Sequence, residues 1–305
     1  MKPGQTQLPE NFEWFSEQIA GHHPSVVRNG EREIGFIKEK GSELLMKPVQ
    51  EGVRGQCEVA VYDRINEWIL NDVLSRNNNN NNSSKFDNDR NRELFIRLAK
   101  FVPKYFGLKT IFIGPKEVQC LLLEDLTYRY KQPCTMDIKI GKVTYDPNST
   151  PAKRRSETIK YPEQKIFGFR LLGYRMHCVE GRPPRVRDKM WGRSRTLENI
   201  LEGEHKILSL SCSFIFLNDN NSLSEYNNNN NWQSIYHFYA SSILIVYEAC
   251  MDRPPRVCVR LIDFSHVFSA NGLCDENYLF GLNNMVDFIE KFIDLKGEEK
   301  LRNGN

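Results

Sequence analysis

An acid and an amine lie two residues apart in an apolar run near the middle of the chain. Asp137 and Lys139 belong to the segment PCTMDIKIG at residues 133–141. Because alternate side chains of an extended strand point to the same face, these two would project together and the intervening apolar residues would face the other way. An acid that orients a hydroxyl, beside an amine that neutralises phosphate charge, suits phosphoryl transfer. A surface ion pair on a strand is the alternative that an Asp-x-Lys spacing alone leaves open.

The composition limits the class of protein. The 305 residues are 40% hydrophobic and 27% charged, a balance ordinary for a soluble globular protein, and the length fits one large domain or two lobes. A net charge of +3 is too small to argue for nucleic acid, and no segment interleaves basic and aromatic residues, so no nucleic-acid partner is expected. Such a charge is compatible with a locally basic pocket for an anionic ligand.

The sequence also constrains location and covalent chemistry. No window of 18 apolar residues occurs and the N-terminus lacks the apolar core of a signal peptide, so we expect neither a transmembrane segment nor a signal peptide. The eight cysteines include no Cys-x-x-Cys pair, which argues against a structural zinc site or a disulfide framework and favours a cytoplasmic or nuclear location. Nothing in the sequence suggests a large exposed interface, and we expect a monomer.

The first part of the chain predicts a small lobe. Its hydrophobic patterns indicate a short helix over 12–19, two strands within 34–47, helices over 58–70 and 94–101, and strands over 110–113 and 118–124.

Two asparagine runs, at 77–82 and 227–231, interrupt the chain. We interpret both as flexible surface insertions, because polar tracts bury too little apolar area to offset the entropy of ordering.

The second part predicts a larger lobe. Its patterns indicate helices over 152–160, 196–208 and 282–292 and strands over 169–178, 241–248 and 257–262. The expected fold class is therefore α+β and bilobal, with an antiparallel-sheet N-terminal lobe at residues 1–126 and a C-terminal lobe at 127–305. Two lobes joined by a short hinge usually hold their ligand in the cleft between them.

The whole run Pro-x-x-x-Asp-x-Lys-x-Gly at 133–141 resembles the signature of the inositol polyphosphate kinase family. The blocks FYASSILIVYE at 238–248, IDFSH at 262–266 and YLFGL at 278–282 resemble further family motifs in the same order. The resemblance implies a kinase-like fold with ATP in the cleft between the lobes, and transfer of the ATP γ-phosphate to an inositol hydroxyl with Mg²⁺. In that reaction Asp137 would orient the hydroxyl or accept its proton, and Lys139 would stabilise the transferring phosphoryl group.

Two places in the first lobe are candidates for holding the nucleotide. Lys47 follows a strand pattern and Glu58 begins the next helix, and in kinase-like lobes a strand lysine reaches the nucleotide phosphates while a helix glutamate holds it. The resemblance also implies an adenine hinge, with the carbonyl of Glu124 and the amide of Leu126 on the adenine edge. The alternatives are a solvent-facing lysine with an unrelated glutamate, and a strand end with a solvated Glu-Asp pair.

Asp263 is the candidate metal ligand. It ends the apolar run VRLID, where a buried unpaired carboxylate would be costly and Mg²⁺ is a suitable partner; an aspartate that caps the following turn is the alternative. The resemblance implies the same role for Asp263. It also implies a place near the metal and the nucleotide phosphates for the hydroxyl of Ser242, which could otherwise belong to a core strand. His266 is a candidate for orienting the acceptor.

Cations at helical spacing are candidates for the acceptor site. Lys153, Glu157 and Lys160 share one face of the helix predicted over 152–160, and fixed cations would match the phosphates of an inositol polyphosphate. Arg193 is a further candidate. A solvated helix face or a localisation signal is the alternative for the Lys-Arg-Arg run at 153–155. Glu157 stands where the resemblance leads us to expect a neutral amide, and a glutamate near phosphates would alter which isomers bind.

Within the family the chain most resembles the multikinase branch, on the order of the YDP, KYP and GF motifs at 145–147, 160–162 and 168–169. This implies inositol tris- and tetrakisphosphate as acceptors, and it allows the head group of phosphatidylinositol bisphosphate. A hexakisphosphate kinase of the same family, or a catalytically silent scaffold that binds inositol phosphates, is the alternative. A protein kinase is excluded, because the chain lacks the Gly-x-Gly-x-x-Gly, His-Arg-Asp and Asp-Phe-Gly motifs.

Overall fold

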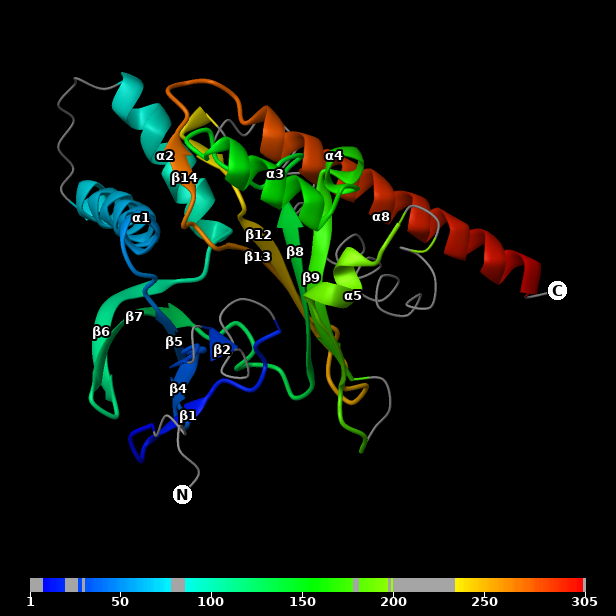
Figure 1. Ribbon diagram of the computed structural model, residues 1–305, viewed down its shortest axis with the longest axis horizontal. Coiled ribbons are helices and arrows are strands. Elements are labelled where there is room, and N and C mark those ends of the chain that lie inside the picture. The colour runs from blue at the N-terminus through cyan, green and yellow to red at the C-terminus, as the bar shows by residue number, and fades with distance from the viewer. Residues whose placement is uncertain are drawn as a thin grey trace. The chain divides into compact units, whose positions relative to one another are not determined.

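The computed structural model of the chain describes residues 8–19, 27–28, 31–77, 86–177, 181–196, 199 and 234–303 (Figure 1). These residues belong to two compact units, Met1–Arg129 and Tyr130–Asn305, and each unit has its own five-stranded antiparallel sheet. The asparagine run at 227–231 and residues 78–82 of the other run lie outside the described residues, as does nearly all of the helix predicted over 196–208. The lobe boundary predicted after Leu126 stays a prediction.

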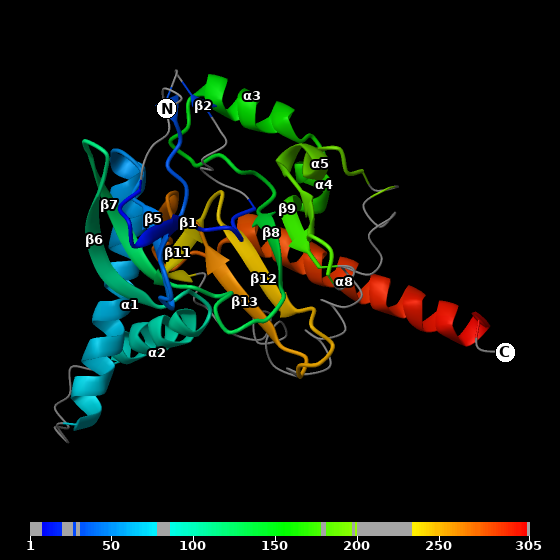
Figure 2. The ribbon, with the colours of Figure 1, turned by 90° about the horizontal axis from the view of Figure 1, so that it is seen from below.

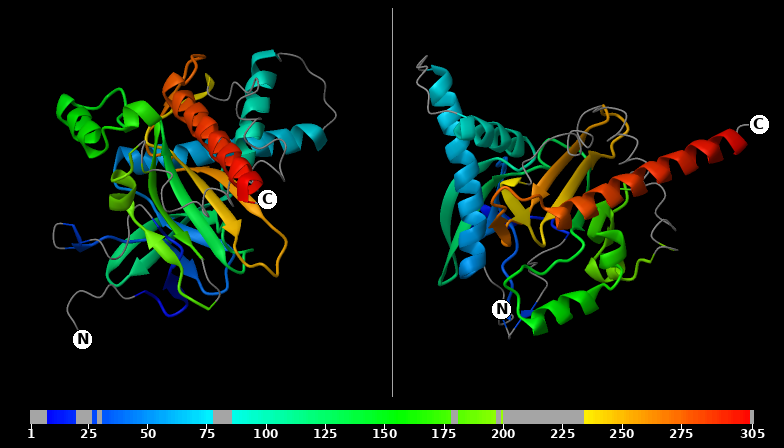
Figure 3. Two further views of the ribbon diagram at one scale, coloured as in Figure 1. Left: turned by 90° about the vertical axis from the view of Figure 1, so that its right-hand side faces the viewer. Right: turned by 90° about the horizontal axis from the view of Figure 1, so that it is seen from above.

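The sheet of the first unit runs in the order β1-β4-β5-β7-β6. Its strands are β1 (Phe12–Trp14), β4 (Ile37–Glu39), β5 (Leu44–Pro48), β6 (Tyr105–Ile113) and β7 (Lys116–Glu124), and a separate hairpin joins β2 (Val27–Arg28) to β3 (Glu31–Arg32). Helices α1 (Val53–Asn77) and α2 (Phe86–Lys100) contact each other (Figure 3). The strands and helices predicted from residue 34 onward in this unit are confirmed.

The helix predicted over 12–19 is wrong. Phe12 and Trp14 lie instead in β1, paired with Glu39 and Ile37 of β4, and both pack against the core of the sheet. A short segment takes the conformation in which its aromatic side chains find apolar neighbours. This tertiary packing overrides a weak helical pattern.

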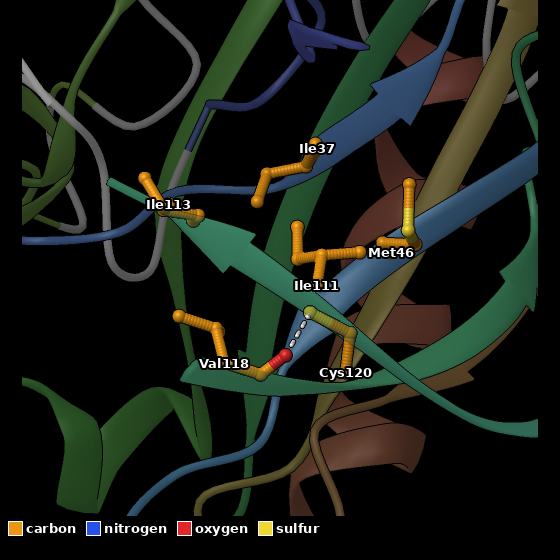
Figure 4. Close-up of a cluster of buried hydrophobic side chains, with 6 residues drawn as sticks. All are labelled: Ile37, Met46, Ile111, Ile113, Val118 and Cys120. Carbon is orange, nitrogen blue, oxygen red and sulfur yellow. Dashed lines mark hydrogen bonds between the residues drawn. The ribbon is translucent and has the colours of Figure 1, made fainter. Parts of the chain in front are cut away.

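The core of this sheet is a cluster of six buried side chains drawn from four strands. The cluster, shown in Figure 4, consists of Ile37, Met46, Ile111, Ile113, Val118 and Cys120. The Sγ atom of Cys120 lies 3.9 Å from the carbonyl oxygen of Val118, and burial raises the pKa of this thiol to about 12. The thiol therefore stays protonated at neutral pH and acts as a core side chain.

The sheet of the second unit runs in the order β10-β9-β8-β12-β13, so the strand that carries Asp137 and Lys139 is central. Its strands are β8 (Pro133–Ile140), β9 (Phe169–Met176), β10 (Arg185–Arg187), β12 (Ser242–Glu248) and β13 (Val257–Ile262), and β11 (Tyr236–Phe238) pairs separately with β14 (Val267–Ser269). The helices are α3 (Pro151–Lys160), α4 (Gln164–Phe167), α5 (Lys189–Arg193) and α8 (Glu276–Asn303), and α8 packs on β8 and β9 (Figure 2). The α+β fold class is confirmed. None of the described helices combines the length and the apolar character that crossing a membrane requires.

Three glycines bring α8 close to the end of β8. The amide of Gly141 donates a hydrogen bond of 2.7 Å to the carbonyl of Gly168, and both residues have a positive φ, of 116° and 70°. A Cβ atom on Gly281 of α8 would lie 1.9 Å from the Gly168 carbonyl oxygen. The absence of side chains here allows the close approach and fixes the chain at Gly141, directly after β8 and two residues beyond Lys139.

Candidate active site

Asp137 and Lys139 lie on the same face of β8. Lys139 is paired with Ser242 of β12 and with Arg170 of β9, and paired residues of antiparallel strands present their side chains on one face. The register between β8 and β9 shifts between Asp137 and Ile138, so β9 carries an extra residue opposite them. Such irregularities increase the local twist and re-aim side chains. The extended conformation predicted for this segment is confirmed.

Charged groups converge around Lys139. Its Nζ atom donates a hydrogen bond of 2.6 Å to the carbonyl oxygen of Ala240. Burial has the largest effect on the pKa of this ammonium and lowers it. The carboxylate of Asp263 has the next largest effect and raises the pKa, as Asp137 also does, whereas the charge of Arg170 lowers it further. Asp137, Lys139 and Asp263, which come from two separate motifs, therefore lie within electrostatic reach of one another.

Asp263 lies directly after β13 and has a left-handed backbone conformation, with φ of 66°. Aspartate and asparagine tolerate this conformation better than most other residues. The carboxylate is half-buried rather than buried, because the chain leaves the sheet at this point, so the expectation of a buried acid is wrong. Ser242 pairs with Ile262, the residue before Asp263; it is fully buried, and its hydroxyl has no hydrogen-bond partner among the described residues.

A metal ion at this place would have few protein ligands. In the described part of the chain, no three His, Cys, Asp or Glu side chains lie close enough to hold one together. The donor set of one carboxylate at Asp263 and one orphaned buried hydroxyl at Ser242 nevertheless fits Mg²⁺. That ion keeps several waters and usually binds through one or two carboxylates together with phosphate oxygens.

Helix α3 gathers the predicted acceptor cations around one carboxylate. Thr150 caps the helix by accepting a hydrogen bond of 3.2 Å from the Lys153 amide. The Nζ atoms of Lys153 and Lys160 each lie 2.6 Å from Oε1 of Glu157. Burial raises the pKa of Glu157, but the hydrogen bonds and charges of the two lysines outweigh burial and lower it to about 2. The predicted common face is confirmed, and Glu157 offsets one of its two positive charges.

His266 and Arg193 lie in different surroundings. Nδ1 of His266 is 2.9 Å from Oδ2 of Asp146, so an acid from the Tyr-Asp-Pro motif orients this ring. Asp146 was not predicted as its partner. Arg193 is the last residue of α5 and lies close enough to Arg170 for its charge to lower the pKa of that guanidinium, in addition to the larger effect of burial.

Arg170 is the residue of this site that was not predicted from the sequence. It is 6% exposed, and its electrostatic neighbours are Arg193, Glu157, Tyr161 and Asp137. The sequence feature from which Arg170 could have been identified is the apolar run GFRLLG at 168–173, in which this arginine is the only charged residue. A charged side chain in a buried strand requires a partner or a ligand.

In the first unit, Lys47 and Glu58 form a buried ion pair. The distance from Nζ to Oε1 is 2.7 Å, and the two residues are 8% and 0% exposed. Lys47 lies in β5 and Glu58 in the second turn of α1, so the predicted contact is confirmed and a solvent-facing lysine is wrong. Apolar residues in the same place are often at least as stabilising as a buried ion pair, which points to a reason other than stability for this one.

The predicted hinge follows directly after β7, of which Glu124 is the last residue. The carboxylate of Asp125 is buried, pairs with Lys38, and accepts hydrogen bonds from the amide and the hydroxyl of Thr127 at 2.8 and 2.7 Å. The alternative interpretation, a strand end with a solvated Glu-Asp pair, is therefore wrong with respect to Asp125. Within the described residues no hydrogen bond uses the Leu126 amide, which the adenine prediction requires to be available.

Comparison with known proteins adds three findings. Residues 120–290 match the family model described as inositol polyphosphate kinase. The chain is 28% identical over 280 residues to inositol polyphosphate multikinase from Mus musculus, and the match covers 88% of this chain but only 63% of that protein. It is 24% identical over 327 residues to inositol polyphosphate multikinase alpha from Arabidopsis thaliana, and that match covers 96% of this chain and 98% of that protein. A crystal structure of inositol phosphate multikinase from S. cerevisiae in complex with ADP and Mn²⁺ is 20% identical, with a TM-score of 0.55, and the match covers 83% of this chain and 100% of that one. The last likeness shows a shared fold.

Proposed function

Because the chain belongs to the inositol polyphosphate kinase family, we propose that it transfers the γ-phosphate of ATP to hydroxyl groups of inositol tris- and tetrakisphosphate. The observation that carries the proposal is the convergence of Asp137, Lys139 and Asp263 in the second unit. An acid, an amine and a metal-binding carboxylate at one place are the groups that phosphoryl transfer to an alcohol needs. The similarity to multikinases supports the choice of acceptors.

The proposed reaction is in-line attack of an inositol hydroxyl on the γ-phosphorus of ATP. Asp137 orients that hydroxyl and accepts its proton, and the 5% exposure of Asp137 limits competing water. Lys139 stabilises negative charge on the transferring phosphoryl group. The hydrogen bond of 2.6 Å to the Ala240 carbonyl holds this ammonium in place before the reaction, so little reorganisation is needed when the charge develops.

The nucleotide is assigned to the groups predicted for it. Lys47, held by Glu58, contacts the nucleotide phosphates, and the backbone groups of Glu124 and Leu126 bind the adenine edge. Asp263 and the hydroxyl of Ser242 would hold Mg²⁺, which when bound would neutralise charge on the phosphate oxygens. The complex of the S. cerevisiae protein with ADP and Mn²⁺ supports ATP and Mg²⁺ as the cofactors.

The acceptor is assigned to the cations of α3 and α5. Lys153, Lys160 and Arg193 bind its phosphates, and His266, itself oriented by Asp146, helps to position it. The head group of phosphatidylinositol bisphosphate carries the same kind of phosphates and is a further proposed acceptor. We also propose that the protein acts as a monomer, in the cytoplasm or the nucleus.

The test is a magnesium-ATP phosphorylation assay that offers inositol trisphosphate, tetrakisphosphate and hexakisphosphate separately, with lipid vesicles as a fourth arm. Asp137→Asn and Asp263→Asn are the controls, and asparagine at 263 keeps the left-handed backbone. Turnover of the tris- and tetrakisphosphates, reduced about 100-fold or more in both controls, supports the proposal. Turnover of hexakisphosphate alone would move the chain to the hexakisphosphate kinases. Binding without transfer to any acceptor would identify a catalytically silent scaffold.

A further inference from the structure

Helix α3 supplies less positive charge than its sequence suggests. Lys153 and Lys160 both contact the ionised Glu157, so two positive charges and one negative charge leave a net charge of +1 on this face. An inositol trisphosphate carries about 4.5 to 6 negative charges near neutral pH, because each of its three phosphates carries about 1.5 to 2. A site for such an acceptor needs further cations close to α3, and the neighbouring strand β9 provides one.

Arg170 is that cation. It is more than nine-tenths buried and is in register with Lys139 on the face of the sheet that also carries Asp137. In the described part of the chain, its Nε and Nη1 atoms are shielded from solvent and have no hydrogen-bond partner. A guanidinium has five N–H donors and keeps its charge in proteins, so leaving the three donors of Nε and Nη1 buried without acceptors is unfavourable. An anionic ligand would supply the missing acceptor atoms.

The surroundings of Arg170 indicate the kind of anion. Arg193 is its strongest charged neighbour, and two guanidinium groups that repel each other are both stabilised when one anion binds them together. The planar fork of a guanidinium suits two-point contact with a phosphate. Asp137, which orients the attacked hydroxyl in the proposed function, is also an electrostatic neighbour of Arg170. The bound phosphate would therefore lie on a ring carbon close to the reacting one.

We propose that Arg170, together with Arg193, binds a phosphate of the inositol acceptor next to the hydroxyl that is phosphorylated, and so selects acceptors that carry a phosphate at that position. This inference rests on the proposed inositol phosphate kinase activity. Arg170 is in this sense a binding and specificity residue, and it takes no part in proton transfer.

A purely structural role and a ligand-binding role for Arg170 predict opposite effects of its replacement on Tm. If Arg170 served only to balance the charge of Glu157 or Asp137, replacing it would remove a favourable charge interaction with that buried carboxylate, and Tm would fall. If it waits for a ligand, Arg170→Leu removes a buried unsatisfied charge from an apolar strand. The Tm of the ligand-free protein would then stay the same or rise while function is lost.

The experiment compares Arg170→Leu and Arg170→Lys with Arg256→Gln, a matched loss of one exposed arginine in the same unit. The binding of inositol trisphosphate is measured by calorimetry, together with KM and kcat for this acceptor, KM for ATP, and Tm. Arg170→Leu should raise the acceptor Kd and KM about 10- to 100-fold and change the ATP KM less than about two-fold, with no fall in Tm. Arg170→Lys should recover part of the affinity, since it keeps the charge but not the fork. Arg256→Gln should leave the acceptor Kd, kcat and both KM values unchanged.

Two results would overturn the inference about Arg170 alone. One is unchanged acceptor binding in Arg170→Leu. The other is a lower Tm with equal losses of affinity for acceptor and ATP, which is the signature of a structural role. Failure of the proposed function is separately visible as binding without transfer by the unsubstituted protein, and in that case calorimetry still tests Arg170. An unsubstituted protein that neither binds nor phosphorylates inositol trisphosphate would overturn both.

Discussion

Replacing Glu157 by glutamine tests how helix α3 divides its charge between stability and binding. The residue is 9% exposed, and Oε1 accepts hydrogen bonds of 2.6 Å from both Lys153 and Lys160. Glutamine keeps the size of the side chain and one acceptor oxygen but removes the negative charge. The variant should therefore be less stable and bind the acceptor more tightly.

The loss of stability follows from the pKa of Glu157. Contact with the two lysines lowers this pKa from 4.5 to about 2, and at about 1.36 kcal/mol per unit the shift corresponds to about 3 kcal/mol. The lysine side chains are 42% and 35% exposed, so solvent screening reduces the expected loss to about 1–2 kcal/mol. For a unit of this size that is a fall in Tm of about 2–8 °C, measured by thermal unfolding at neutral pH.

The pH dependence supplies a sharper check. Because the pKa of Glu157 is lower in the folded state, its contribution to stability is complete above the unfolded value of 4.5 and is lost as the pH falls towards about 2. The Tm difference between the unsubstituted protein and Glu157→Gln should be constant from neutral pH down to about 5 and should shrink below that. A difference that grows in acid would refute the assignment of the charge to Glu157.

Acceptor binding should change in the opposite direction. Removing the carboxylate raises the net charge of the α3 face from +1 to +2, and one charge contact at 4 Å is worth about 1 kcal/mol in water. The KM for inositol trisphosphate should fall about five-fold, and by more at low salt. Glu290→Gln, which removes an exposed carboxylate from α8, is the matched control. If Glu157→Gln loses acceptor affinity as well as stability, Glu157 itself holds the acceptor and the electrostatic reasoning is refuted.

Two further changes test how the two units hold their functional groups. Gly281→Ala should destabilise the protein by about 1–3 kcal/mol, because the new Cβ would lie 1.9 Å from the Gly168 carbonyl oxygen. Thermal unfolding measures this loss, with Asn283→Ala at an exposed position of the same helix as the control. An unchanged Tm in Gly281→Ala would contradict the prediction. Lys47→Met should destabilise the protein by about 3–5 kcal/mol because it removes the cation paired with the fully buried Glu58, whereas the double change with Glu58→Leu should restore Tm but not ATP binding. Recovery of ATP affinity by calorimetry in the double variant would contradict the proposed role of Lys47.

The parts of the fold that the sequence predicts are those whose information is local. Strand β5, helix α1 and strand β7 each carry enough periodic apolar residues to be recognised without knowing their partners. Strand β1 has only three residues and exists because it pairs with β4, whose residues lie 23 to 27 positions further along the chain. No local pattern records that pairing, and a helix was predicted in its place.

The same distinction explains which site contacts were predicted. The common face of Lys153, Glu157 and Lys160 depends only on helical spacing, which the sequence displays. The contact between His266 and Asp146 joins residues 120 positions apart. The importance of Arg170 depends on the register of β9 against β8, including the shift after Asp137, and only the folded sheet determines that register.

The cations of the proposed acceptor site differ in their readiness to bind a phosphate. Lys153 and Lys160 each donate to Glu157, so an acceptor phosphate must compete with a carboxylate for them. Nε and Nη1 of Arg170 donate to no group among the described residues, so a phosphate there would replace nothing. A phosphate at Arg170 would gain the full strength of a charge-assisted hydrogen bond, about 1.5–3 kcal/mol. A phosphate at α3 would gain only the difference between the free energy of its own contact with a lysine and that of the contact with Glu157 that it replaces. Discrimination between inositol phosphate isomers should therefore be steepest at the ring position that faces Arg170, and shallower at the positions that face α3.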